Sequence, residues 1–486
     1  RQMCIRDRVQ NAVLPQVRSN RLPEEDKTDL IDKDAPEEPK KPKDLRVADL
    51  ACGSGHILNE CFDLLYDLYI ASGFGRGEAI ESIFANNLLG IDIDERARQL
   101  ATFALMLKAC QRDDSFADAR ALPQVLSMPE VNETQAEEFF RLSDISGEAL
   151  KELREAFDLM KDADSLGSIM RFDICGSTRV LLQQTLDHWT HQSDKPETVL
   201  AAIPAVRLIL ALTDSYDAIV MNPPYMPTSR VDVLKTYATK NYPDSKTDLF
   251  SVFMDVCIDR LKDGGKYGMI NMQTWMFLSS YETLRKKILD TQHIDSLLHL
   301  GPRTFDELSG EVVQNAAFII SKDSSQVAEG IYYRLIDGKN CEAKREMYFY
   351  NENSYIITDQ KQFEKITGSP IAYWISEKFI ESIQSANLNT CCFADGQILT
   401  GDNDRYLRLF WETSKENTGI AGSKWQLITK GGTYRKWYGN ILHIIDFSPE
   451  AIDHYKSDRI ARLLKEKYWF REGCTWSDIA SNLSLI

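Results

Sequence analysis

Short apolar runs alternate with amphipathic stretches from about residue 45 to residue 321. Helical spacing is clearest over residues 95–109 and 249–261. Strands that alternate with helices in this way indicate a mostly parallel sheet with both faces covered. The pattern therefore predicts an α/β, Rossmann-like fold. The runs with a buried-strand pattern are LRVADLA, LLGIDID, PQVLSM, YDAIVMN, KYGMINM, IDSLLHL and VVQNAAFIIS.

The alternation is interrupted once and later fades. From about residue 129 to residue 200 the sequence is charged and helical, and it is longer than a normal crossover, so we expect a helical insertion there. From residue 331 to residue 486, aromatic residues mix with turn signals, which predicts a second, mixed α/β region. Residues 45–330 would form the first domain.

The two ends of the chain have unusual sequences. Residues 1–44 are expected to be a leader or linker, because residues 22–43 contain four prolines and many charges. The opening letters RQMCIRDR resemble translated sequencing-adapter read-through, so part of this leader is expected to be an artefact. The start at Arg1 and the abrupt end TWSDIASNLSLI predict a fragment of a longer protein.

The composition excludes several classes of protein. The net charge of −16 argues against nucleic-acid binding, which usually shows as a basic surface; residues 401–486 are the exception, with 13 Lys+Arg against 11 Asp+Glu. No CxxC pair and no HExxH occur, and His188 with His191 fits a surface helix better than a metal site, so no metal is expected. Scattered cysteines indicate a cytoplasmic protein, and no apolar run is long enough to span a membrane.

Two segments at predicted strand ends suit a nucleoside ligand. In DLACGSG (residues 49–55), the glycines let the backbone approach a ligand closely. Asp92 in GIDID ends the next strand, where a carboxylate can accept both hydroxyl hydrogens of a ribose. The third glycine of GxGxxG and a P-loop lysine are both missing, so a pyrophosphate is not expected. S-adenosyl-L-methionine fits these conditions, although a plain tight turn also explains the glycines alone.

The strongest signal is NPPY, directly after the predicted strand YDAIVM. The prolines remove two backbone donors and leave the Pro223 carbonyl free. That carbonyl and the Asn222 side-chain oxygen can both accept from one exocyclic amino group. Tyr225 supplies an aromatic face for a planar base.

These three segments occur in the order seen in DNA methyltransferases that modify adenine N6, and the chain resembles that family. Leu50 stands where the family usually has proline, in DPACGSG. From about residue 45 onward the chain is similar to the PglX methyltransferases of BREX phage-defence systems, which are much larger. The segments that carry this resemblance include YDLYIASGFG, DLFSVFMD, GGKYGMINMQTWMFLSSYETLR, TGDNDRYLRLFWE and KGGTYRKWYGN.

The resemblance implies a class I methyltransferase domain, and S-adenosyl-L-methionine as its cofactor. Asp92 and Ile93 would hold its ribose side. Ser127 and Met128 are our choice for its adenine side, and Asp164 is the competing candidate. The segment that would close over the cofactor contains Ser245, Lys246, Thr247, Asp248 and Phe250. Thr247 or Asp248 would instead, or in addition, cap a helix. The residues expected around its methionine end are Asp49, Ala51, Cys52, Gly53, Ser54 and Gly55.

The resemblance also implies residues that act on the target. An adenine swung out of double-stranded DNA would be held by Asn222, Pro223, Pro224 and Tyr225. Phe305 would be a second aromatic against the base or an ordinary packing residue. The region from residue 331 would begin a target-recognition region, unless its aromatics form a core. Its candidate DNA-binding residues are Arg405, Arg408, Tyr434, Arg435, Lys436 and Trp437.

Other functions remain open on sequence grounds. NPPY also serves methylation of an RNA base or of a protein glutamine. A third possibility is a defence component that recognises DNA, with methylation secondary. Double-stranded DNA is the expected partner, together with other BREX proteins.

Overall fold

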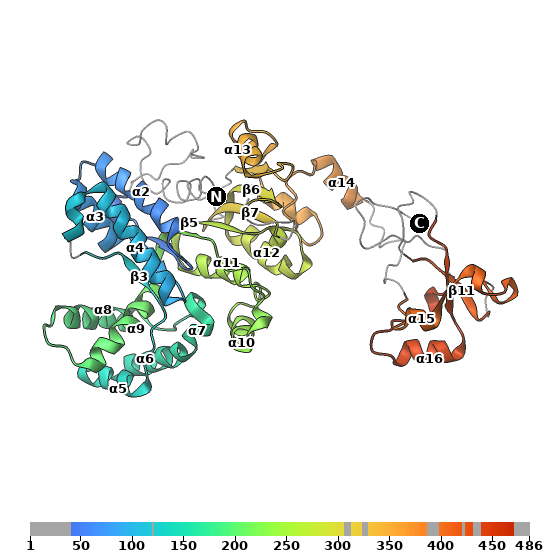
Figure 1. Ribbon diagram of the computed structural model, residues 1–486, viewed down its shortest axis with the longest axis horizontal. Helices are drawn as coiled ribbons and strands as arrows, with labels where there is room; N and C mark the ends of the chain where they lie inside the picture. Colours follow the sequence, from blue (N-terminus) through green and yellow to red (C-terminus); the bar gives the residue numbers. More distant parts are fainter. Residues whose placement is uncertain are drawn as a thin grey trace. The chain divides into compact units, whose positions relative to one another are not determined.

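The computed structural model describes residues 40–118, 121–305, 313–322, 329–385, 398–419, 423–430 and 439–470. The chain divides into two compact units, residues 1–384 and residues 385–486 (Figure 1). The first unit contains a nine-stranded sheet and the second a three-stranded sheet. Among the helices in the described part of the chain, none is both long and apolar enough to cross a membrane.

The large sheet is mostly parallel. Strands β7 and β9 run opposite to their neighbours, and the other pairs of neighbouring strands run in the same direction. The order 3-2-1-4-5-7-6 with a reversed β7 is that of a Rossmann-like class I methyltransferase, so the predicted fold class is confirmed. From one edge to the other, the strands are β3 (Gln124–Leu126), β2 (Leu88–Ile91), β1 (Val47–Asp49), β4 (Tyr216–Met221), β5 (Leu261–Met272), β7 (Asn315–Ser321), β6 (His293–Gly301), β8 (Gly330–Arg334) and β9 (Ser354–Ile357).

The central strands form because their sequences are apolar on both faces. Every residue of β1, β2 and β4 is buried, as expected for parallel strands covered by helices on either side. Val47 is in register with Leu88 of β2 and with Ala218 of β4. The carboxyl ends of these three strands therefore meet at one edge of the sheet, where ligands of such folds bind.

Helices cover both faces of the sheet. On one face, α2 (His56–Ala71), α3 (Arg76–Ser82) and α4 (Glu95–Arg112) share an apolar cluster with β1, β2 and β4. On the other face, α11 (Leu249–Arg260), α12 (Glu282–Thr291) and the helices of the insertion share a larger cluster.

The helical insertion lies between β3 and β4, and its helices gather beside the sheet (Figure 1). The first of these helices begins at a capping box, in which the Asn132 side chain accepts from the Gln135 backbone and the Gln135 side chain accepts in return. The five helices are α5 (Glu133–Leu142), α6 (Gly147–Leu159), α7 (Ala163–Leu166), α8 (Gly176–His191) and α9 (Glu197–Leu212).

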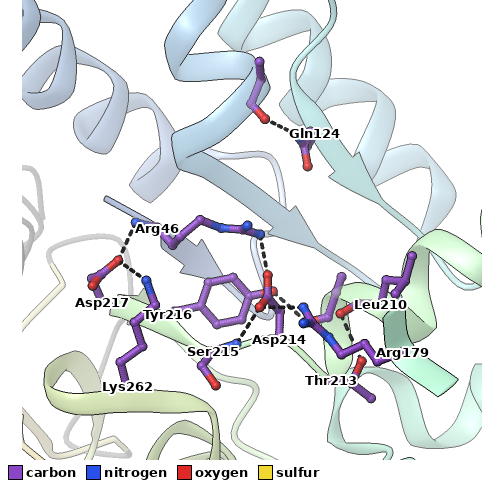
Figure 2. Close-up of polar contacts among 12 residues, drawn as sticks. Arg46, Gln124, Arg179, Leu210, Thr213, Asp214, Ser215, Tyr216, Asp217 and Lys262 are labelled. Atoms are coloured by element: carbon purple, nitrogen blue, oxygen red, sulfur yellow. Dashed lines mark hydrogen bonds and ion pairs between the residues drawn. The ribbon is translucent and has the colours of Figure 1, made fainter. Parts of the chain in front are cut away.

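The amino edge of the sheet carries a group of paired charges (Figure 2). Asp214, just before β4, pairs with Arg46 and with Arg179 of α8, each at 2.7 Å. Asp217 is completely buried and pairs with Lys262 at 2.8 Å, while its other contacts are Lys40 and the Arg46 backbone N–H. These ion pairs join the insertion, β1, β4 and β5 on the side away from the strand ends that bind ligands.

The first unit extends past residue 330, where the sequence suggested a domain boundary. β8 pairs in parallel with β6, and β9 pairs with β8, so both strands complete the large sheet. Further helices of this part of the chain are α10 (Asp232–Asn241), α13 (Cys341–Phe349) and α14 (Glu377–Ser385).

The second unit is small. Its three strands pair in the order β10 (Leu407–Leu409), β12 (His443–Asp446) and β11 (Trp425–Ile428), and all pairs are antiparallel. Helices α15 (Asn403–Tyr406) and α16 (Pro449–Ser457) pack on this sheet through Tyr406, Ile445 and Tyr455. It is therefore a mixed α/β region, as the sequence predicts.

Candidate active site

A cavity of about 180 Å³ opens at the carboxyl edge of the large sheet. Three strand ends surround it: the loop after β1, the end of β4 with Asn222, and the β5 residues Gly268 and Ile270. Phe305 completes the wall. The cavity therefore brings together the glycine-rich segment, the first residue of NPPY and the predicted second aromatic. The residues from the β1 side are Asp49, Ala51, Cys52, Gly53, Ser54, His56 and Ile57.

The loop after β1 needs its glycines for conformation and for packing. Gly53 and Gly55 have φ angles of 54° and 82°, a region that favours glycine. A Cβ at Gly55 would also lie 2.9 Å from the Cβ of Ala101 in α4, which is too close. Small residues thus let the loop turn directly into α2 and leave space beside β1.

Asp49 contributes a buried carboxylate to the cavity wall. It is 1% exposed, and its Oδ1 accepts from the Ala51 backbone N–H at 3.1 Å. Its Oδ2 is buried and finds no hydrogen-bond partner among the described residues. Burial raises the pKa of Asp49 to about 8, and the nearby Asp92 adds to this. An unpaired buried carboxylate oxygen at a cavity suits a cationic ligand group, such as the ammonium of a methionine moiety.

Asp92 lies beside this loop although it does not line the cavity. Its Oδ2 accepts from the Gly53 backbone at 2.8 Å, and its Oδ1 accepts from the Asp94 backbone at 2.9 Å. Each oxygen keeps a further lone pair for a ribose hydroxyl. The neighbouring Ile93 is 48% exposed, as an apolar wall for a flat ring would be before the ligand binds.

The two candidates for the adenine side of the cofactor, Ser127 with Met128 and Asp164, lie in different segments of the chain. Ser127 donates to Glu95 at 2.5 Å, and Met128 packs against the large apolar cluster. Asp164 is exposed on α7. The turn that follows α7 comes closer to the cofactor segments, because a Cβ on Gly167 would lie 3.6 Å from Ile93 Cδ1.

A buried network that the sequence did not indicate joins this turn to the loop after β1. Ser168 donates to the Leu50 carbonyl oxygen, and Arg260 donates to the carbonyls of Ser168 at 2.7 Å and Met170 at 2.8 Å. Burial lowers the pKa of Arg260. Ser168 and Leu50 are 118 residues apart, so no local pattern could have revealed this contact.

The NPPY segment follows β4 directly and is held by contacts with β5 and β7. Pro223 is buried and Pro224 is exposed. Tyr225 is half-buried, and its hydroxyl lies 3.1 Å from Asn222 Oδ1 and 3.1 Å from the Ile270 carbonyl oxygen. Asn315 Nδ2 donates to the same hydroxyl at 3.2 Å. Burial raises the pKa of Tyr225, which keeps this hydroxyl protonated.

The loop before α11 supports the NPPY segment from the other side. Asp248 Oδ1 accepts from the Met226 backbone at 3.1 Å and from the Phe250 backbone at 3.2 Å. The Leu249 N–H also donates to the Met226 carbonyl at 2.9 Å. The predicted helix cap at Asp248 is thus confirmed, whereas its contact with a cofactor stays a prediction.

Phe305 and Cys52 also lie in the cavity wall. Phe305 both lines the cavity and packs against the cluster of Ile270, Leu298 and Ala317, so the two roles expected for it are compatible. Burial raises the pKa of the Cys52 thiol, and this cysteine is therefore protonated at neutral pH.

The candidate DNA-binding residues belong to the second unit. Arg405 is exposed, with its guanidinium 5.0 Å from the centre of the Tyr406 ring. Arg408 donates to the carbonyls of Asp404 and Leu407, each at 2.6 Å. The other four candidates, Tyr434, Arg435, Lys436 and Trp437, lie outside the described residues.

No metal centre emerges from the described ranges, where no three His, Cys, Asp or Glu side chains group as metal ligands. His188 and His191 are both exposed on α8. His191 contacts the Asp187 carbonyl of its own helix at 2.7 Å.

Comparisons with known proteins support the resemblance that the order of the motifs suggested. Residues 86–305 match the family model of the Eco57I restriction-modification methylase. The adenine-specific methyltransferase BrxX of Escherichia coli O9:H4 (strain HS) is 34% identical over 91% of this chain. The adenine-specific methyltransferase PglX of Lacticaseibacillus casei (strain Zhang) is 33% identical over 94% of it. The predicted resemblance to PglX methyltransferases is therefore confirmed.

These relatives are much longer than the present sequence. The chain spans 39% of the BrxX length and 40% of the PglX length. Among solved structures, the Type ISP restriction-modification enzyme LlaGI in complex with a DNA substrate mimic is similar with a TM-score of 0.44 and 14% identity. That match covers 70% of this chain and 25% of LlaGI.

Proposed function

We propose that this chain carries the methyl-transfer site of an adenine-specific DNA methyltransferase similar to PglX. The reaction would move a methyl group from S-adenosyl-L-methionine to the N6 amino group of an adenine in double-stranded DNA. The observation that carries the proposal is the single cavity wall shared by the Asp49–Gly55 loop, Asn222 and Phe305. A cofactor segment and a base-binding segment would meet there.

The residues around the cavity suit the cofactor. When bound, S-adenosyl-L-methionine supplies a methyl group activated by a sulfonium. The unpaired oxygen of Asp49 would bind the ammonium of its methionine end, and the open glycine loop would leave room for that end. Asp92 would accept from the ribose hydroxyls while it holds Gly53. Ile93 and the Gly167 turn, together with Ser127 and Met128, are the candidates for the adenine side.

The NPPY residues would act on the target base. The adenine must leave the duplex, at a cost of a few kcal/mol that stacking on Tyr225 and Phe305 would offset. Asn222 Oδ1 and the Pro223 carbonyl would accept from the N6 amino group and orient its lone pair toward the methyl group. A direct displacement needs no enzyme nucleophile, in keeping with the protonated Cys52 thiol in the cavity wall.

Part of the DNA-binding surface would belong to the second unit, where the candidate DNA-binding residues are Arg405, Arg408 and Tyr434–Trp437. Phosphate contacts by such residues position a duplex without reading its sequence.

The test is transfer of a labelled methyl group to unmethylated DNA, RNA and protein by the complete gene product. We expect methylation of adenine in DNA, and we expect Asn222→Ala and Tyr225→Ala to abolish it. Base-resolved methylation mapping in a host with and without the gene would identify the site. Undiminished adenine methylation in either variant, or transfer to RNA or protein alone, contradicts the proposal.

A further inference from the structure

A buried asparagine of β7 contacts the tyrosine of the NPPY segment. Asn315 is 0% exposed, and its Nδ2 donates to Tyr225 Oη at 3.2 Å and to the Asn271 carbonyl at 3.3 Å. The Tyr225 hydroxyl lies 3.1 Å from Asn222 Oδ1 and 3.1 Å from the Ile270 carbonyl. One hydroxyl group thus joins the ends of β4 and β5 to the start of β7.

The donor on Asn315 sets the direction of these hydrogen bonds. An amide NH₂ only donates, and a carbonyl oxygen only accepts. With Asn315 donating to Oη, the single hydrogen of the Tyr225 hydroxyl points to Asn222 Oδ1 or to the Ile270 carbonyl. When it points to Asn222, that residue presents its oxygen. The second lone pair of the same oxygen is then available to an amino group in the cavity.

The amide of Asn315 is a poor choice for stability alone. Its Oδ1 is buried and lacks a hydrogen-bond partner within the described part of the chain. Burying an unpaired polar atom destabilises a fold. The next three residues of β7, which are Ala316, Ala317 and Phe318, are apolar and buried, so an apolar residue would suit this position. The benefit of the amide therefore lies in its contact with Tyr225.

We propose that Asn315 is a positioning residue for methyl transfer. Through the Tyr225 hydroxyl it holds the Asn222 amide with its oxygen available to the target amino group. This inference rests on the proposed function and adds to it a residue that acts only through Tyr225 and Asn222. Without the donor, the Asn222 amide can turn by half a rotation and direct its NH₂ at the target amino group. The misplaced acceptor slows the transfer step and leaves the binding of cofactor and DNA unchanged.

The test is a double-mutant cycle on the complete gene product, with kcat for methyl transfer to unmethylated genomic DNA as the readout. Tyr225→Phe keeps the ring and removes the hydroxyl. Asn315→Leu keeps the shape of the side chain and removes the donor. We expect each single variant to lose about tenfold in kcat, the worth of one hydrogen bond. The double variant should lose no more than Tyr225→Phe alone, with KM for DNA and Kd for the cofactor unchanged.

Asn271 supplies a matched control. It is also 0% exposed, but its side-chain amide donates to the sulfur atoms of Met254 and Met269 and does not contact the Tyr225 hydroxyl. Asn271→Leu keeps the backbone carbonyl that accepts from Asn315, so any loss in this variant should multiply with the loss in Tyr225→Phe. If thermal melting shows that Asn315→Leu is unfolded, the smaller Asn315→Ala, which also lacks a donor, replaces it in the same cycle.

The outcomes separate the two proposals. Losses that multiply between positions 315 and 225, or an unchanged kcat in a folded Asn315 variant, overturn the positioning role and leave the proposed function intact. A parent enzyme that transfers no methyl group to DNA overturns the proposed function and this inference together.

Discussion

Asp49 and Asp217 are buried carboxylates on the adjacent strands β1 and β4. Asp49 is the last residue of β1, at the carboxyl edge of the sheet, whereas Asp217 lies near the start of β4, at the amino edge. Burial raises the pKa of Asp217, yet its hydrogen bonds with Lys262, drawn in Figure 2, and with Lys40 outweigh burial and hold the pKa below the usual range. Among the described residues no cation pairs with Asp49, and burial raises its pKa to about 8. The Asp217 carboxylate thus has cations on both of its oxygens, whereas the Asp49 carboxylate has one buried oxygen without a partner in the described part of the chain.

This difference shows how one sheet separates stability from binding. The paired charges of the amino edge hold the insertion, β1, β4 and β5 together. The carboxyl edge retains an unfavourable carboxyl group, which a ligand of opposite charge would stabilise. Strongly shifted groups of this kind gather at functional sites. Substitution of Asp217 should therefore lower the free energy of unfolding, whereas substitution of Asp49 should lower the affinity for the ligand.

The largest effect is expected at the amino edge. Asp217→Ala removes the partner of Lys262, Lys40 and the Arg46 backbone N–H, and should lower the free energy of unfolding by about 3 kcal/mol. Affinity for S-adenosyl-L-methionine should not change in the folded protein. Denaturant unfolding measures the first quantity and calorimetry the second. Equal stability of the variant and the parent would show that this edge is not the stabilising one.

Substitution of the carboxylate at the other edge should act on binding. Asp49→Asn removes the negative charge offered to the ligand, so affinity for S-adenosyl-L-methionine should fall by about 2 kcal/mol, or roughly 30-fold. The unfolding free energy of the ligand-free protein should stay the same or rise at pH 8, because a costly buried charge is lost. A variant that binds as tightly as the parent would remove Asp49 from the site.

The pH dependence of binding sharpens the comparison further. Between about pH 4 and pH 8, Asp49 is protonated in the folded, ligand-free protein and ionised in the unfolded chain, so the stability that it contributes decreases as the pH rises. A cationic ligand favours the ionised form. Affinity should therefore increase from pH 6 to pH 8, by up to about 1.4 kcal/mol per pH unit. Calorimetry at three pH values should show this slope in the parent and none in Asp49→Asn.

The smallest effect is expected at the contact between the insertion and the cofactor loop. Ser168→Ala removes the hydrogen bond to the Leu50 carbonyl and should cost about 1 kcal/mol of stability. Because this loop borders the cavity, cofactor affinity should also fall a few-fold, unlike in Asp217→Ala. Thr236→Ala, which removes an exposed side-chain contact on α10, is the control and should change neither quantity. An unchanged affinity in Ser168→Ala would assign this contact to stability alone.

Much of the fold could be predicted from short apolar runs, because strands buried on both faces are mostly apolar. β8 and β9 were missed as members of the large sheet because their sequences mix aromatic and polar residues. The place of β8 depends on its pairing with β6, which is 35 residues earlier in the chain at the paired positions, and β9 in turn pairs with β8. The cap at Asp248 was predictable because it is a local feature.

The candidate site likewise contains residues that local sequence patterns could place and residues that they could not. Asp49, Asp92 and Asn222 could be placed at neighbouring strand ends, since parallel strands end at one edge. The third cofactor segment could not be placed, because a long insertion separates Ser127 from the Gly167 turn. Asn315 gave no signal either, because its contact with Tyr225 joins residues 90 positions apart.

The sequence by itself determined the α/β class, the strand that precedes each motif and the chemical character of the cavity wall. These depend on local periodicity and on residue types. Only the tertiary structure decided which carboxylate is paired, which polar atom is left without a partner, and which side chains contact the Tyr225 hydroxyl. Such properties depend on distances between residues far apart in the chain and on their removal from water, and neither is encoded in a local pattern.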